Sequence, residues 1–176
     1  MRPFTVHTSI SAPREEVFDV VGDLAQRVGW CDHYMRDFRL ARARSTGVGA
    51  AARFELDAPL ASTWCEVTIE VYDRPRRIVE RCRLWRRGRT PAAAVYELLR
   101  DVHGSTRVEL TVWSEPATRI DALKESLGGR RWLRRQTKRA LERLRSAVEG
   151  EREEPLPRAR IAGYEPLKAP RFGSQI

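Results

Sequence analysis

Between residues 36 and 114, apolar side chains repeatedly occupy every second position of the sequence. The alternation is clearest over residues 52–57, 64–72 and 106–114, and a period of two is typical of strands that bury one face. Short turns separate about six such segments, so consecutive strands are expected to pair as an antiparallel meander. This pattern restricts the chain to folds built on one large antiparallel sheet with few helices.

Helical patterns flank the strand region. Residues 4–11 alternate as a first strand, and Pro13 then opens a helix whose apolar positions recur at helical spacing. A second helix is predicted from Thr118 to Val148, with Gly128–Gly129 inside it. Because glycine is a poor helix former, the helix either bends there or begins anew at Arg130. Alanine at both glycines is predicted to stabilise the chain.

The length of 176 residues fits one domain, which we place at residues 1–150. Residues 151–176 contain four prolines and no helical period, so they are predicted to form an extended tail. No segment approaches the ~20 apolar residues of a bilayer span, and the N-terminal residues do not form a secretory signal. Three cysteines without a CxxC pair favour a reduced, cytoplasmic setting.

The net charge of +9 is concentrated in one segment. Residues 118–150 carry 10 basic and 4 acidic side chains, a balance of +6. We interpret the basic residues of the predicted helix as its solvated outer face. No nucleic-acid motif accompanies them, so no nucleic-acid partner is expected. A weak contact between this helix and an anionic membrane stays open.

Local motifs resemble the SRPBCC superfamily, which includes START domains, plant pollen allergens and the polyketide cyclase/dehydrase group. They are the segment 10–18 (ISAPREEVF), Trp30, the turn at 47–49 before Arg53–Phe54, the segment 74–77 (RPRR) and the hairpin at 104–108. The resemblance covers residues 4–149. It implies an α+β helix-grip fold, in which a curved antiparallel sheet wraps around a long C-terminal helix and leaves an internal cavity.

Members of this superfamily bind apolar molecules in the cavity, some as carriers and some as enzymes. Inward strand positions and the helix stripe are expected to converge there, with Trp30 at the mouth and Tyr96 as a polar handle. The residues predicted to contact ligand are Trp30, His33, Tyr34, Phe54, Leu56, Val67, Ile69, Tyr96, Val112, Leu123 and Leu127.

Other reactive side chains are better explained structurally. The run Cys31–Tyr34 has too few ligands for a metal site and no partner that would orient a Cys–His nucleophile pair. Arg81 and Arg83 are expected on the surface, although the alternation leaves the inward face of the strand at 78–86 undecided. We predict no metal and no cofactor.

The favoured function is therefore binding or transfer of a hydrophobic, lipid- or polyketide-like molecule. An aromatase/cyclase-type enzyme acting on a polyketide is the alternative, and it would need at least two polar groups converging in the cavity. A peripheral membrane or interaction module using the basic helix is a further alternative. The sequence leaves the ligand and the oligomeric state open.

Overall fold

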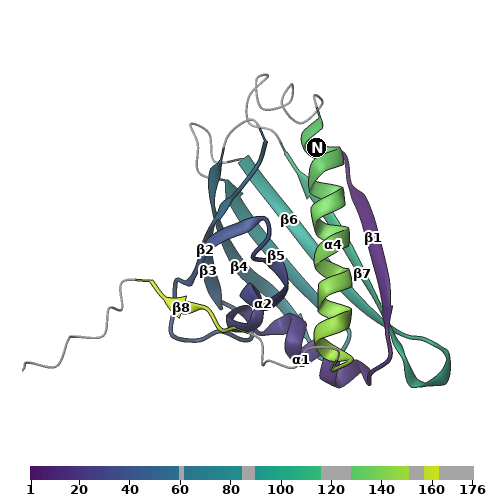
Figure 1. Cartoon of the computed structure of the whole chain (residues 1–176). Helices are drawn as coiled ribbons and strands as arrows, with labels where there is room; N and C mark the ends of the chain where they lie inside the picture. Colours follow the sequence, from purple (N-terminus) through teal and green to yellow (C-terminus); the bar gives the residue numbers. More distant parts are fainter. Residues whose placement is uncertain (60–61, 85–89, 116–127, 151–156, 163–176) are drawn as a thin grey trace, which may run out of the picture.

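The computed structural model describes residues 1–59, 62–84, 90–115, 128–150 and 157–162 of the chain. Within these residues, eight strands form one sheet in the order β1-β7-β6-β5-β4-β3-β2-β8 (Figure 1). The strands are β1 (Phe4–Ile10), β2 (Met35–Leu40), β3 (Ala51–Leu56), β4 (Thr63–Asp73), β5 (Arg77–Leu84), β6 (Thr90–Arg100), β7 (Thr106–Ser114) and β8 (Arg160–Ile161). From β2 to β7, each strand pairs antiparallel with the next, as the alternation predicted.

The first strand closes one side of this meander. β1 pairs antiparallel with β7, so the start of the chain lies beside residues more than 100 positions later. α1 (Arg14–Gly22), the 3₁₀ turn η1 (Leu24–Gln26) and α2 (Val28–Cys31) then lead from β1 to β2. A second 3₁₀ turn, η2 (Val102–Gly104), joins β6 to β7.

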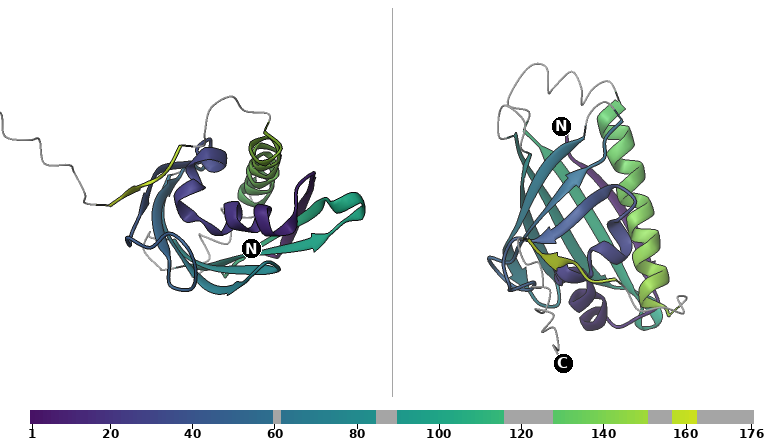
Figure 2. Two further views of the ribbon diagram at one scale, coloured as in Figure 1. Left: turned by 90° about the horizontal axis from the view of Figure 1, so that it is seen from below. Right: turned by 60° about the vertical axis from the view of Figure 1, so that its left-hand side comes forward.

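The long helix α4 (Arg130–Val148) packs against β1 and α2. Figure 2 shows the sheet curving around one side of the molecule, with α4 across its open side. This is the predicted α+β helix-grip fold. The buried face of α4 carries Thr137, Ala140, Leu141 and Leu144, which recur at helical spacing. None of the described helices is long and apolar enough to cross a bilayer.

The structure resolves the two faces of β5. Ile78 and Glu80 are buried, whereas Arg81 and Arg83 are exposed. Arg81 pairs with Glu70 of β4 at 2.5 Å on the outer face, as expected of a surface arginine. The inward face therefore includes one carboxylate, Glu80, among apolar neighbours. The alternation of β5 was ambiguous because apolar Val79 shares the outward parity of Arg81 and Arg83.

Residues 157–162 of the predicted tail lie along the sheet. β8 pairs in parallel with β2, and the amide of Ala159 donates to the carbonyl of Ala25 at 2.7 Å. The guanidinium of Arg158 contacts the carboxylate of Asp23 at 3.0 Å. This part of the tail therefore covers the edge of β2, whose backbone groups would otherwise be unpaired.

The helix α4 begins immediately after the glycine pair. Gly128 has φ of +120°, a conformation that is strained for any residue with a Cβ, whereas Gly129 has helical φ and ψ of −56° and −43°. The expectation that alanine at both positions would stabilise the chain is therefore wrong for Gly128. Only at Gly129 does the backbone already suit alanine.

The two single substitutions should change the free energy of unfolding in opposite directions. We expect Gly128→Ala to lower the free energy of unfolding by about 1–3 kcal/mol, because it forces an L-residue into a strained conformation. Gly129→Ala should raise it by about 0.4–1 kcal/mol through lower entropy of the unfolded chain. Urea denaturation of both variants measures the difference, and equal effects would contradict the assigned backbone geometry.

Candidate functional site

A cavity of about 210 Å³ lies between the concave face of the sheet and α4. Six of the residues predicted to contact ligand line it: Tyr34, Phe54, Leu56, Val67, Tyr96 and Val112. Met35 and Phe38 of β2, Leu84 of β5 and Leu133 of α4 add to the apolar wall. The cavity therefore has contributions from most of the sheet and from the helix that crosses it.

The other predicted residues are placed differently. Trp30 is fully buried and is not among the residues that line the cavity, so its expected position at a mouth is corrected. Ile69 is also fully buried, within the core beside the cavity. Leu123 and Leu127 lie outside the described residues, so the predicted helical wall is represented here by Trp132, Leu133 and Thr137.

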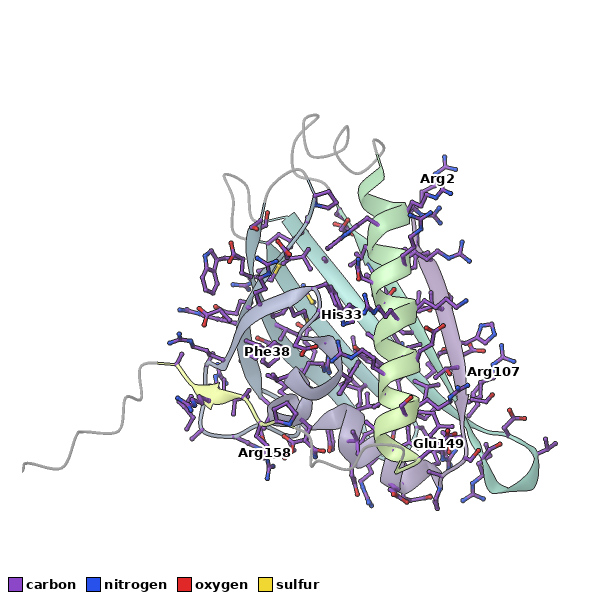
Figure 3. The ribbon with its side chains drawn as sticks, viewed as in Figure 1. Arg2, His33, Phe38, Arg107, Glu149 and Arg158 are labelled. Atoms are coloured by element: carbon purple, nitrogen blue, oxygen red, sulfur yellow. The ribbon has the colours of Figure 1, made fainter. Side chains whose placement is uncertain are left out.

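His33 connects α2 to α4 and does not line the cavity (Figure 3). Its Nε2 lies 3.2 Å from the carbonyl oxygen of Gln136, and its Nδ1 lies 3.1 Å from Nη1 of Arg143. Because Arg143 can only donate, Nδ1 accepts and Nε2 carries the proton. Burial and the nearby Arg143 lower the pKa of His33, which favours this neutral form. Its role is therefore to fasten the helices together.

The polar part of the cavity wall is a buried cluster of Arg27, Glu80 and Tyr96. Arg27 lies between η1 and α2, Glu80 on β5 and Tyr96 on β6. The guanidinium of Arg27 donates to both carboxylate oxygens of Glu80, at 2.5 and 3.3 Å, and to the hydroxyl of Tyr96 at 2.9 Å. Arg27 and Glu80 are each only 2% exposed.

Aromatic rings and backbone complete the surroundings of Arg27. Its guanidinium carbon lies 4.7 Å from the ring centroid of Trp30 and 5.2 Å from that of Tyr96. Nη2 also donates to the carbonyl oxygen of Val21 at 3.2 Å. The Nε–H of Arg27 has no hydrogen-bond partner among the described residues. Four of the five donors of this side chain are thus used, and one remains available.

Electrostatics keep Arg27 charged and Tyr96 neutral in this cluster. Burial alone would lower the pKa of Arg27, but the facing carboxylate of Glu80 raises it well above its usual value. Burial raises the pKa of Tyr96 well above its usual value, although Arg27 opposes the effect. Tyr96 therefore stays protonated near neutral pH. Its oxygen accepts from Arg27, while no described residue accepts its proton.

Sequence reasoning missed Arg27 and Glu80. Arg27 follows Gln26 in a helical segment with no local pattern that marks it as buried, and Glu80 stands in a strand whose faces could not be assigned. The available signal was the position of Glu80 itself, since it has the same strand parity as Ile78, Cys82 and Leu84. An inward carboxylate requires a buried cation, and that requirement would have prompted a search for one.

The cysteines contribute apolar surface and no reactive thiolate. Cys65 and Cys82 line the cavity, whereas Cys31 contacts the hydroxyl of Tyr34 at 3.8 Å. Burial raises the pKa of Cys31 and of Cys65 to about 12. Because the thiolate is the nucleophile, these thiols are unreactive near neutral pH. No group of three metal-ligating side chains occurs in the described part of the chain.

Known structures share this fold. The sequence matches no protein-family model and no curated protein. TTHA0849 from Thermus thermophilus is similar with a TM-score of 0.67 and 16% identity, over 85% of this chain and 99% of that one. A START superfamily protein from Mycobacterium smegmatis gives 0.61 and 11%, over 85% and 99%. Ara h 8.0201 gives 0.58 and 9%, over 85% and 98%. The chain thus shares the fold of these structures, which is the predicted helix-grip fold.

Replacing one member of the Arg27–Glu80 ion pair should change the free energy of unfolding far more than replacing both members. Glu80→Ala leaves the buried charge of Arg27 uncompensated and should cost about 3–5 kcal/mol of unfolding free energy. Replacing both residues by methionine removes both charges and should cost far less, or stabilise the fold. Urea denaturation of the two variants tests this. A Glu80→Ala cost below about 1 kcal/mol would show that the cavity solvates Arg27.

Proposed function

We propose that this protein binds an apolar small molecule that carries an oxygen function, held in the cavity between the sheet and α4. The observation that supports this most is the composition of the cavity wall, which is mostly apolar. The only buried ion pair among the described residues, Arg27–Glu80, also lies in this wall, beside Tyr96. An engineered apolar cavity of about 150 Å³ is enough to bind benzene. The volume of about 210 Å³ suits a ligand somewhat larger than that.

Apolar transfer supplies the affinity in this proposal. Phe54, Leu56, Val67 and Val112 offer ligand surface from three strands, and burying apolar area is worth roughly 25 cal/mol per Å² before ordering costs. Binding should therefore depend little on salt.

Orientation comes from Tyr96. Its hydroxyl is fixed by the hydrogen bond from Arg27, and its proton is free to be donated to a ligand oxygen. A carbonyl, ether or hydroxyl oxygen of an otherwise apolar molecule would fit this donor.

An aromatase/cyclase acting on a polyketide is the second candidate. The convergence of Arg27, Glu80 and Tyr96 supplies the polar groups that this alternative requires. Binding remains the preferred function because the charges of Arg27 and Glu80 are engaged with each other, and because the raised pKa of Tyr96 makes it a weak acid. General acid–base catalysis is most effective when the pKa lies near the working pH.

Filling part of the cavity with a larger side chain should weaken ligand binding without unfolding the protein. Ala94 of β6 lines the cavity and faces Val112 across the β6–β7 pair. We expect Ala94→Phe to reduce the affinity for 2-methoxynaphthalene at least tenfold, because the added ring occupies ligand space. The fold should persist, since an open cavity has room that a packed core lacks.

Isothermal titration calorimetry measures this binding, and Val71→Phe is the matched control at an exposed position of β4. Unchanged affinity in Ala94→Phe would refute the cavity as the binding site. Native mass spectrometry of freshly purified protein would, in addition, identify the class of any co-purified ligand.

The hydrogen bond from Tyr96 can be isolated with two ligands of similar shape. We expect Tyr96→Phe to weaken 2-methoxynaphthalene about fivefold, the usual effect of losing one hydrogen bond, and to leave 2-ethylnaphthalene unchanged. Tyr72→Phe, outside the cavity lining, should alter neither. Equal weakening of both ligands would refute the donor role. A turnover loss of 100-fold or more on a poly-β-keto substrate would favour the enzyme.

A further inference from the structure

The outward side of the first turns of α4 carries only cations. Residues 130–139 contain six basic side chains and no acidic one. Five of the six form an exposed surface that we term the basic face: Arg131, Arg134, Arg135, Lys138 and Arg139. The sixth, Arg130, donates to the carbonyl oxygens of Arg2 and Pro3 and thereby ties the helix to the chain start.

Elsewhere on the surface, several exposed arginines are paired with carboxylates, as in Arg74–Asp19 at 2.8 Å and Arg81–Glu70 at 2.5 Å. Others, such as Arg77 and Arg83 of β5, have no ion-pair partner among the described residues. Within the described residues, Arg131, Arg134 and Arg135 have no ion-pair partner. The cluster on α4 is distinctive because five exposed cations share one helix face and no acidic residue occurs among residues 130–139.

The cluster is also unfavourable for the helix that carries it. Arg131 and Arg135 are four positions apart, as are Arg130 and Arg134, and like charges at this spacing repel. Cations in the first turn also oppose the helix dipole, which favours negative charge at the N-terminal end. An anionic partner would relieve both effects at once.

The basic face adjoins one end of the cavity. Gly129, Trp132 and Leu133, on the same turns of α4, line the cavity together with Met1 and Trp113. These five residues are partly exposed. Exposed Arg2 lies at this same end of the molecule (Figure 3). Cations next to tryptophan side chains form the combination that suits the headgroup region of a bilayer.

We propose that the basic face docks on an anionic lipid bilayer and holds this end of the cavity against it. Each arginine near an anionic surface gains from the surface potential, and the flanking tryptophans sit at headgroup level. A bilayer also dissolves the apolar ligands that the cavity would hold. A lipid surface is favoured over nucleic acid because the partly exposed tryptophans beside these charges line an apolar cavity, so they adjoin apolar surface that a bilayer can cover. The docking goes beyond the proposed function and needs no bound ligand.

Vesicle co-sedimentation tests the docking. The vesicles are phosphatidylcholine alone, or phosphatidylcholine with about 30 mol% phosphatidylglycerol. We expect binding only to the anionic vesicles. This binding should be lost when the salt concentration rises from about 0.1 M to about 1 M, because the Debye screening length falls from ~10 to ~3 Å. The triple variant R131Q/R134Q/R135Q should bind roughly 100-fold more weakly.

The matched control is R39Q/R81Q/R100Q, which removes the same number of charges from exposed ion-paired positions. It should bind like the parent protein. The α4 triple variant should melt at or above the parent temperature, because like-charge repulsion is removed, and should bind 2-methoxynaphthalene normally without vesicles. Equal losses in the two triple variants would overturn the proposal, as would parental vesicle binding by the α4 variant. Binding to DNA or to an acidic protein without vesicle binding would overturn it too.

Discussion

The buried ion pair between Arg27 and Glu80 joins the short helical segment to the middle of the sheet. Removing two charges from water costs several kcal/mol each, and this cost is offset only when the charges meet in good geometry. The two-pronged contact with Glu80, the hydroxyl of Tyr96 and the carbonyl of Val21 provide that geometry. The position of η1 and α2 over the sheet is therefore tied to this one interaction.

Several features of the cavity depend on the same pair. Trp30 is buried beneath the guanidinium of Arg27 and is edge-on to Tyr96, with ring centroids 6.4 Å apart. Tyr34, a few residues later, is thereby brought to the cavity wall near α4, where its ring meets Trp132 at 6.4 Å. The cavity consequently has a rigid polar region on the sheet side and an apolar wall elsewhere. A ligand would be oriented by the Tyr96 hydroxyl, which Arg27 already holds in position before any ligand binds.

The sequence predicts the fold well because the strands and helices of this fold follow from the local periodicity of apolar residues. Alternation assigned the inward residues Phe54, Val67 and Tyr96, and these do line the cavity. Periodicity contains no information on partners distant in sequence, so the pairing of Arg27 with Glu80, 53 residues apart, could not be derived from it. Trp30 was misplaced for the same reason: its burial follows from the arginine above it. The glycine pair was misjudged at Gly128 because composition does not report φ.

The two faces of α4 link the binding site to the surface. Its inner side provides Leu133 and Thr137 to the cavity, while its outer side carries the basic face. The C-terminal half of the same helix is held firmly, since Arg143 contacts Asp32 at 2.6 Å and the ring of His33. Its first turns have no comparable ion pair with a described residue. They follow Gly128, whose φ of +120° would be strained for any residue that has a Cβ. A surface that attracts the basic face would therefore lie against the same turns of α4 that supply Trp132 and Leu133 to the cavity wall.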